Sequence, residues 1–333
     1  MLRVWFLALC ALLATPAMAD LYSGEVAVAD QSEAERTAAN AEALKQVLVK
    51  VSGDQAAAER PQVAGALKDP TPLVQAFYYR QEVDRSGATP QLKLYYVANF
   101  EPRAITRLLS SSGLAQWARE RPTLMVWVAM AESSAALSES ELQPLLRRAT
   151  ERGIVLKRGL DEDAAASGNL DTRDVDVLKQ IASRAGVPGV LAGRLFPSSD
   201  NVIGRFAFND GERTESFEVS GASPSDTLRA AADETANRLA SRYAFDAADS
   251  TPEPVRAVIR NIGDAGDYAR AQSYLASLSI VRELRQSAAA GNTLTLDMSV
   301  SGGGERLKSI VGLGDVMSAA GESIDGEVVL DLR

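Results

Sequence analysis

The chemistry open to this chain is limited first by two side chains. None of its 333 residues is a histidine, and its one cysteine is Cys10. Serine–histidine–aspartate and cysteine–histidine catalysis, imidazole acid–base chemistry and the usual zinc and haem ligand sets all require one of them. No Ser-x-x-Lys pattern occurs either. The side chains left for chemistry are carboxylates, hydroxyls, lysines and aromatic rings.

Acidic residues near the middle of the chain form a dense group of possible cation ligands. They are Asp161, Glu162, Asp163, Asp171, Asp174 and Asp176. A calcium loop of the EF-hand type needs glycine at its sixth position and glutamate at its twelfth, and no such frame exists here. Carboxylates are also favoured at helix N-termini. The sequence therefore favours solvated charges in a loop and at a helix start.

Three glycines, Gly302-Gly303-Gly304, precede a possible helix over residues 307–311. Glycine-rich loops at helix starts bind phosphate through backbone amides. The Walker pattern needs a fixed glycine spacing before its lysine, and Lys308-Ser309 follows a leucine instead. Gly312 and Gly314 lack the third glycine of a dinucleotide fingerprint. A flexible turn is the favoured interpretation.

Aromatic rings and paired acids are the last candidates for chemistry. The rings that could line a sugar or peptide platform are Trp117, Trp127, Tyr78, Tyr79, Tyr95 and Tyr96. Packing within cores and sheets is the favoured role for them. Any two of the 44 acids could form a glycosidase pair, but their separation is a three-dimensional quantity. The sequence therefore assigns no catalytic, cofactor-binding or metal-ligating residue, and no cofactor.

Residues 1–19 have the features of a signal peptide. Arg3 gives the positive start, residues 4–13 the apolar run, and Ala17-Met18-Ala19 the cleavage site. An uncleaved anchor would need an apolar run of about 20 residues. A lipoprotein would use Cys10, but the bulky Leu9 precedes it. We expect cleavage after Ala19 and a periplasmic location.

Cleavage changes the charge and the redox chemistry of the chain. It removes one arginine and the only cysteine, so 34 basic residues oppose 44 acidic ones and the net charge becomes −10. This charge disfavours a nucleic-acid partner, whose phosphates it would repel. No second apolar stretch approaches spanning length, so no membrane span is expected after cleavage. Without disulfides, stability must come from core burial.

The first folded stretch, residues 21–53, predicts a strand that leads into an amphipathic helix. Residues 21–29 alternate with period two, and Ser32 with Glu35 forms a capping box. Gly53 ends the helix. Beyond it, residues 77–83 and 92–100 predict a hairpin, and residues 103–110 a helix. These elements define a small mixed α+β domain over residues 20–121.

The segment SEAERTAANAEALKQVLVKVSG resembles the start of a proteobacterial envelope family known as domain of unknown function 2066. The resemblance covers most of the mature chain in order and spacing. Over about thirty residues the stretch also looks like the amino-terminal domain of the flagellar assembly protein T family. Neither family supplies a catalytic motif.

A second domain is predicted over residues 122–248. Residues 124–130 form an apolar run typical of a strand buried on both faces, and Ser138 with Glu141 caps the helix that follows. Residues 202–208 and 214–219 predict a hairpin. The order β-α-β-α-β-β-β-α, with GVPGVLAGRLF before the hairpin, resembles the amino-terminal domain of TolB and the curli-secretion G family. That resemblance implies an envelope interaction unit.

Residues 249–254, DSTPEP, predict a linker, because proline and small polar residues discourage regular structure. Residues 255–333 then follow the order β-α-β-β-α-β of the ferredoxin-like fold. The chain as a whole is therefore expected to be a multi-domain α+β and α/β protein.

These observations favour a non-catalytic periplasmic cell-envelope protein that works as a protein-interaction or assembly module, with an envelope or periplasmic protein as its partner. Two alternatives stay open. One is a carboxylate-dependent, glycosidase-like envelope hydrolase, which needs a deep cleft with two convergent acids and aromatic walls. The other is a binder of a small ligand or lipid, which needs an apolar cavity.

Overall fold

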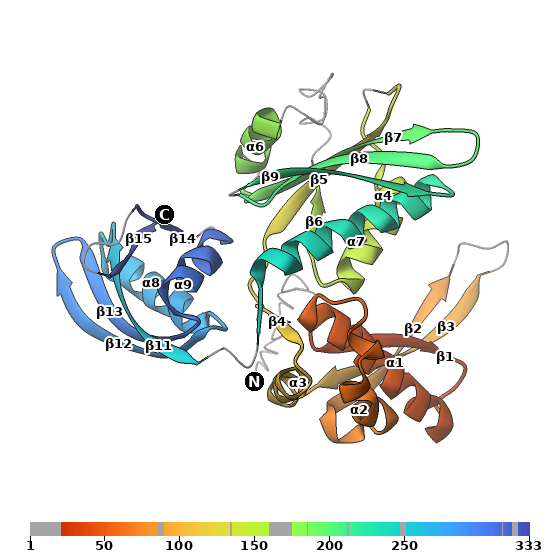
Figure 1. Cartoon of the computed structure of the whole chain (residues 1–333), viewed down its shortest axis with the longest axis horizontal. Coiled ribbons are helices and arrows are strands. Elements are labelled where there is room, and N and C mark those ends of the chain that lie inside the picture. The colour runs from red at the N-terminus through yellow and green to blue at the C-terminus, as the bar shows by residue number, and fades with distance from the viewer. Residues whose placement is uncertain are drawn as a thin grey trace, which may run out of the picture.

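The chain is mixed α+β and contains several sheets, each with its own helices (Figure 1). A computed structural model describes residues 21–84, 90–133, 135–159, 175–184, 186–211, 213–246, 251–314, 316–321 and 326–333. The predicted signal peptide, residues 1–19, lies outside these residues. We call residues 21–114 the N-terminal module, residues 122–243 the middle module and residues 251–333 the C-terminal module.

The N-terminal module is a three-stranded antiparallel sheet with helices on one face. Its strands, in the spatial order β1-β3-β2, are β1 (Ser23–Val28), β3 (Gln91–Phe100) and β2 (Val74–Asp84). The helices are α1 (Glu33–Ser52), α2 (Ala64–Lys68) and α3 (Pro102–Ser111), with 3-10 turns at Ala57–Glu59, Pro61–Val63 and Thr71–Leu73. Helix α1 touches β1 closely, since a Cβ on Gly24 would lie 2.6 Å from the Cα of Ala43. The predicted strand, helix and hairpin of this region are therefore present.

The start of α1 differs in one detail from the predicted capping box. The Ser32 hydroxyl accepts the Glu35 amide at 3.3 Å, as expected. The return bond is not made, because the Ser32 amide donates to Asp30 at 2.7 Å. The Glu35 carboxylate instead accepts the amide of Ala29 at 3.2 Å. Gly53 ends the helix with φ +76°, as predicted.

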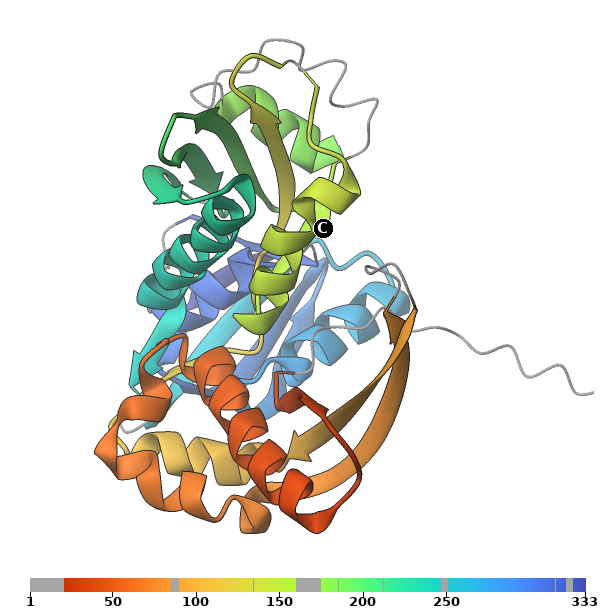
Figure 2. The ribbon, with the colours of Figure 1, turned by 90° about the vertical axis from the view of Figure 1, so that its right-hand side faces the viewer.

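The middle module is a five-stranded sheet with helices on both faces. The strands, in spatial order, are β6 (Val155–Arg158), β5 (Thr123–Met130), β7 (Gly189–Pro197), β8 (Val202–Asn209) and β9 (Thr214–Gly221). Helices α4 (Glu139–Glu151) and α7 (Pro224–Tyr243) pack side by side on one face, and α6 (Val175–Arg184) packs on the other (Figures 1 and 2). Strand β5 is accordingly buried on both faces, which its apolar sequence predicted.

Two local predictions in this module are confirmed. The Ser138 hydroxyl accepts the Glu141 amide, and the Glu141 carboxylate accepts the Ser138 amide at 2.7 Å, so both halves of the capping box are present. Strands β8 and β9 pair antiparallel from Val202 opposite Gly221 to Asn209 opposite Thr214. Gly211, just after β8, has φ +104°.

The C-terminal module is a sheet in the order β12-β13-β11-β15-β14. Its strands are β11 (Pro252–Arg260), β12 (Val281–Ala290), β13 (Thr293–Ser301), β14 (Met317–Ala319) and β15 (Val328–Leu332). Helices α8 (Ala265–Ser277) and α9 (Gly303–Gly312) pack against the apolar face. The opposite face carries ion pairs, Arg256 with Asp297 and Arg260 with Asp331.

Half of the predicted linker is strand. Pro252, Glu253 and Pro254 pair with β13, opposite Ser301, Val300 and Ser299. Strand β15 begins to pair with β11 only at Ala257, so residues 252–254 have a neighbouring strand on one side only. Proline, which has no backbone N–H to donate, is tolerated at such an edge position. The linker interpretation was therefore wrong for residues 252–254, while residues 249 and 250 lie outside the described part of the chain.

The segments that join the modules pair with each other. Strand β4 (Ala115–Trp117) leaves the N-terminal module and β10 (Ala244–Asp246) leaves the middle module, and the two form an antiparallel ribbon between the three modules (Figure 1). The sequence analysis predicted neither strand. Within the described residues, we find no helix long and apolar enough to span a bilayer.

Candidate functional site: an arginine junction between the modules

One short segment, residues 115–121, contacts all three modules. Its Trp117 is 1% exposed and packs in the core shared by the middle and C-terminal modules. The polar groups around it are Glu120 and Arg121 on the segment, together with Arg152, Asp233 and Asn237 of the middle module. We call these six residues the junction.

Arg121 connects the C-terminal ends of two helices. Its guanidinium donates to the carbonyl of Lys50 in the last turn of α1 at 2.6 Å, and to the carbonyl of Gly153 just after α4 at 2.7 Å. A cation at this position complements the negative end of a helix dipole and satisfies carbonyls that have no partner within the helix. The same guanidinium lies 3.8 Å from the centroid of the Trp117 ring. Arg121 therefore joins the N-terminal module to the middle module.

Burial lowers the pKa of Arg121 without removing its charge at neutral pH. Loss of solvent lowers its pKa to about 9, while Tyr22 and Glu120 act in the opposite direction. The guanidinium remains protonated at neutral pH, so its charge is balanced mainly by carbonyl dipoles. Such a group is costly to bury unless each of its donors has an acceptor.

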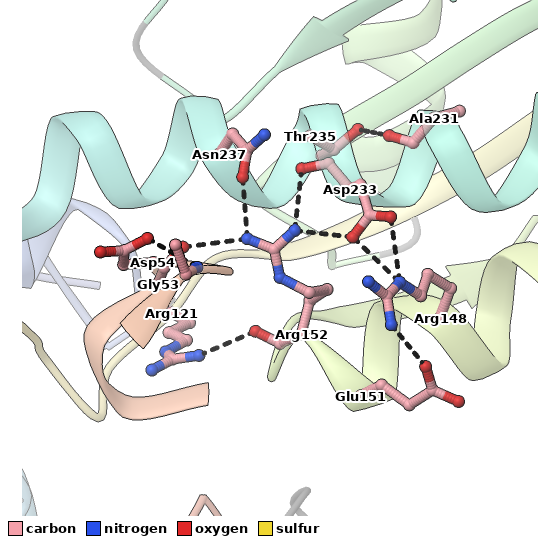
Figure 3. A network of polar contacts seen from close by, with 11 residues as sticks. Gly53, Asp54, Arg121, Arg148, Glu151, Arg152, Ala231, Asp233, Thr235 and Asn237 are labelled. Carbon is pink, nitrogen blue, oxygen red and sulfur yellow. Dashed lines mark hydrogen bonds and ion pairs between the residues drawn. The ribbon is translucent and has the colours of Figure 1, made fainter. Parts of the chain in front are cut away.

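Arg152 is fully buried and makes the second connection (Figure 3). It donates to Asp233 at 2.6 Å, to the side-chain oxygen of Asn237 at 2.8 Å and to the carbonyl of Gly53 at 2.9 Å. Asp233 also accepts two bonds from Arg148, at 2.9 and 3.0 Å. The C-cap of α1 is thus fixed to α4 and α7 through one guanidinium.

Glu120 extends the junction to the C-terminal module. Its carboxylate accepts the backbone amide of Ser279 at 2.8 Å and the hydroxyl of Ser279 at 2.6 Å. Ser279 lies between α8 and β12. On the ribbon, Arg306 of α9 lies 4.1 Å from the ring centroid of Phe245. These polar contacts, together with the apolar core shared by the middle and C-terminal modules, connect all three modules.

The junction is arranged to bind its own chain. Arg121 and the two terminal nitrogens of Arg152 donate to carbonyls and side-chain oxygens of the protein, while the buried Nε of Arg152 has no hydrogen-bond partner among the described residues. The Asp233 carboxylate is shared by two guanidinium groups. General acid–base chemistry requires a titratable group that can reach a substrate proton. The geometry of these groups instead fixes helix ends against one another.

The acidic cluster proposed from the sequence contributes no observed site. Asp161, Glu162, Asp163, Asp171 and Asp174 lie outside the described residues, and Asp176 is described only as part of the backbone of α6. Among the residues that are described, no three acidic, cysteine or histidine side chains lie close enough to hold a metal ion.

The glycine-rich stretch forms the turn into α9. Gly302 and Gly303 have φ of +81° and +73°, a backbone conformation that favours glycine. A Cβ on Gly303 would lie 2.6 Å from a carboxylate oxygen of Glu253. An acid thus stands where a phosphate would have to approach, and like charges repel.

The aromatic residues do not form one platform. Trp117 packs in the core shared by the middle and C-terminal modules, whereas Trp127 packs beneath α6. Phe77 and Tyr79 contact Tyr96 in the N-terminal module in tilted and edge-on geometry, with ring centroids 5.4 Å apart in each pair. Tyr78 is 52% exposed, and Tyr95 lies under Arg80 at 4.8 Å. Core and sheet packing accounts for most of these rings.

A pocket of about 440 Å³ lies at the β11–β13 part of the C-terminal module. Its lining residues are Pro254, Val255, Arg256, Asp297, Met298, Gly326 and Glu327. The hydrogen bond from Arg256 lowers the pKa of Asp297, which favours the ionised form that a general acid cannot use. No aromatic ring lines this pocket, so it lacks the walls expected of a carbohydrate cleft.

Comparison with known proteins gives one family match. A family model described as a domain of unknown function, DUF8605, matches residues 16–118, which cover the N-terminal module and β4. It is a different family from domain of unknown function 2066, and that resemblance stays a prediction. No curated protein matches the chain.

One solved structure shows a weak likeness. Selenomethionine-substituted allophanate hydrolase of Kluyveromyces lactis is 8% identical with a TM-score of 0.16. The match covers 78% of this chain and 66%, just under two thirds, of that one. A TM-score of this size bears on neither fold nor function.

Proposed function

We propose that this chain is a non-catalytic periplasmic cell-envelope protein, and that it binds a protein partner through surfaces of more than one module at once. The proposal rests above all on the junction. A chain that needs only tethered domains can join them with flexible linkers. Here the fully buried Arg152, together with Arg121 and the half-buried Glu120, holds three modules in one arrangement.

Burying charged groups at the junction costs free energy, and this cost supports the view that a fixed orientation of the modules has a function. Buried charged groups add little net stability compared with apolar packing, and their better-attested use is to specify one arrangement. A partner that contacts two modules gains affinity when those modules are already oriented, because less entropy is lost on binding. Orientation would have no such value for modules that act separately.

The finer fold assignments belong to the same proposal. Strands β12, β13 and β11 with helix α8 have the arrangement of a split βαβ unit, which supports a ferredoxin-like assignment for that part. The end of the module departs from that fold, because β15 pairs parallel with β11 and β14 precedes β15 in the chain. The middle module, with α4 and α7 on one face, supports the TolB-like assignment and with it an envelope interaction role. The predicted leader over residues 1–19 and the mature charge of −10 support export to the periplasm.

The experiment is quantitative crosslinking of the tagged full chain in envelope extracts, followed by mass spectrometry. It compares wild type with Glu120→Gln, which loosens the C-terminal module, Arg152→Met, which loosens the N-terminal module, and Arg285→Met as control. Arg285 lies on β12, its side chain is 80% exposed, and it pairs with Glu283 at the surface. Circular dichroism confirms that each variant is folded at the temperature used.

We expect a partner that crosslinks equally to wild type and Arg285→Met, and several-fold less to both junction variants. Recovery of no partner by the wild type would contradict the proposal. So would turnover of an envelope compound by purified protein, if it is lost when two neighbouring acids are replaced.

A further inference from the structure

We propose that strand β2 pairs antiparallel with β2 of a second copy of this chain, so that two N-terminal modules share one six-stranded sheet. This inference goes beyond the proposed function, which concerns a different partner. It rests on two observations. Side chains of α1 cover the β1 edge of the N-terminal sheet but not the β2 edge, and the residues of β2 match in charge when two copies pair.

The β1 edge is closed by side chains of α1. The side-chain amide of Gln46 donates to the carbonyl of Glu25 at 2.7 Å and accepts the amide of Glu25 at 2.9 Å, as a neighbouring strand would. Lys50 donates to the carbonyl of Ser23 at 2.9 Å. Three of the backbone groups through which β1 could bind another strand are thus already used.

The β2 edge has no such cover among the described residues. Strand β2 ends the order β1-β3-β2, and residues 76–84 pair with β3 without a register shift. No lysine or proline interrupts this stretch. Phe77, Tyr78 and Val83 are 47%, 52% and 45% exposed. Soluble proteins usually protect an edge strand with bulges, lysine, proline or a covering segment, because it offers a row of unpaired backbone groups.

Another long edge strand carries protection that residues 76–84 of β2 lack. Strand β12 has register shifts between Val281 and Glu283 and between Gln286 and Ala288, which twist it away from flat pairing. The contrast identifies β2 as an edge whose sequence permits pairing.

The side chains of β2 select the second copy as the occupant. Tyr79, Gln81 and Val83 lie on the face that α1 covers, and Arg80 and Glu82 on the other. A twofold pairing that keeps each face continuous must centre on one residue. When Gln81 is the centre, Arg80 faces Glu82 of the second copy twice, and Tyr79 faces Val83 twice. Opposite charges and aromatic–aliphatic pairs are favourable across strands.

The alternative centres are less favourable. Centring on Arg80 or on Glu82 places like charges directly opposite each other, which destabilises a pair of strands. Centring on Phe77, Tyr78 or Tyr79 leaves both charged residues facing neutral ones. Of the centres from residue 77 to residue 82, Gln81 alone places Arg80 opposite an acid without also placing like charges opposite each other. Arg80 already pairs with Glu25 and with Glu82 of its own chain at the monomer surface, and its side chain remains 41% exposed, so the second copy adds an acid to an existing pair.

The register makes Gln81 a position where one residue meets itself. Gln81 is exposed, and its side chain makes no hydrogen bond to a described residue, so its replacement should leave the monomer intact. Gln81→Lys and Gln81→Glu each place two like charges across the twofold axis. An equimolar mixture of the two variants pairs lysine with glutamate and permits a heterodimer. This rescue depends on the predicted register.

The test is sedimentation velocity on the full mature chain over a concentration series, with Ala289→Lys on the exposed β12 edge as control. We expect wild type and Ala289→Lys to form dimers, each Gln81 variant to dimerise at least about ten-fold more weakly, and the mixture to recover the dimer. A monomeric wild type, an unaffected Gln81→Lys, or a mixture that stays monomeric would each overturn the proposal. Gln81→Lys should still crosslink to the envelope partner as wild type does. Failure of the dimer and failure of the proposed function can therefore be distinguished.

Discussion

Replacing Arg152 with methionine should weaken the attachment of the N-terminal module to the middle module more than replacing an exposed arginine with methionine. Methionine keeps most of the side-chain volume and removes four hydrogen bonds, two of them to Asp233. Asp233 retains Arg148, and water can replace the donor at the exposed Asn237, but the buried Gly53 carbonyl loses its donor. An unsatisfied buried acceptor costs about 1 to 3 kcal/mol, partly offset because a buried charge is removed. We expect a net loss of about 2 kcal/mol.

Trp117 provides the assay. The mature chain has two tryptophans, Trp117 at the junction and Trp127 beneath α6, so Trp127→Phe makes Trp117 the sole reporter. Urea unfolding of that background, followed by fluorescence, measures the stability of the junction region. The control is Arg285→Met, because exposed pairs contribute about 0 to 1 kcal/mol. A loss below about 1 kcal/mol for Arg152→Met would refute the view that this guanidinium holds the modules together.

Three further predictions concern single contacts. Glu120→Gln should weaken the bonds to Ser279 by about 1 to 2 kcal/mol, seen as faster hydrogen exchange of the Ser279 amide, and an unchanged rate would contradict this. Hydrogen bonds from Ser138 lower the pKa of Glu141 below its ordinary 4.5, so its contribution is present above that pH and lost as the pH falls through the lower folded value. Melting curves of Glu141→Gln should therefore depend less on pH below about 4.5. Gly24→Ala should cost about 2 kcal/mol or more, because its Cβ would overlap the α1 backbone at Ala43, and an unchanged melting temperature would show that α1 can move.

Sequence patterns correctly predicted those elements that depend on residues close to one another in the chain. The capping box of Ser138 and Glu141 and the β8–β9 hairpin depend on neighbouring residues, and both are present. The same reasoning was incomplete at Ser32, because Asp30, two residues earlier, takes the amide that the motif assigns to Glu35. A motif of this kind thus fails when another side chain in the same turn competes for the donor.

The junction could not be predicted in this way. Strands β4 and β10 have three residues each, too few to show a period, and they pair across more than a hundred residues of sequence. Arg152 immediately precedes the helix-ending Gly153, so the sequence did show a cation at a helix terminus, where it is favoured. Nothing local indicated that its partners would be Asp233 and the carbonyl of Gly53. Those contacts exist only once α1, α4 and α7 converge.

The junction and the β2 edge lie in different parts of the molecule, and this separation gives them independent roles. Figure 1 shows the β2–β3 hairpin projecting on the side away from the C-terminal module. Pairing of two copies through β2 would therefore leave both C-terminal modules exposed, while Glu120 and Arg152 fix the direction in which each one points. Two chains with the predicted mature charge of −10 repel each other, so the pairing must be local and matched in charge, as Arg80 and Glu82 allow. Loosening the junction should then weaken partner binding without affecting the dimer, and Gln81→Lys should do the reverse.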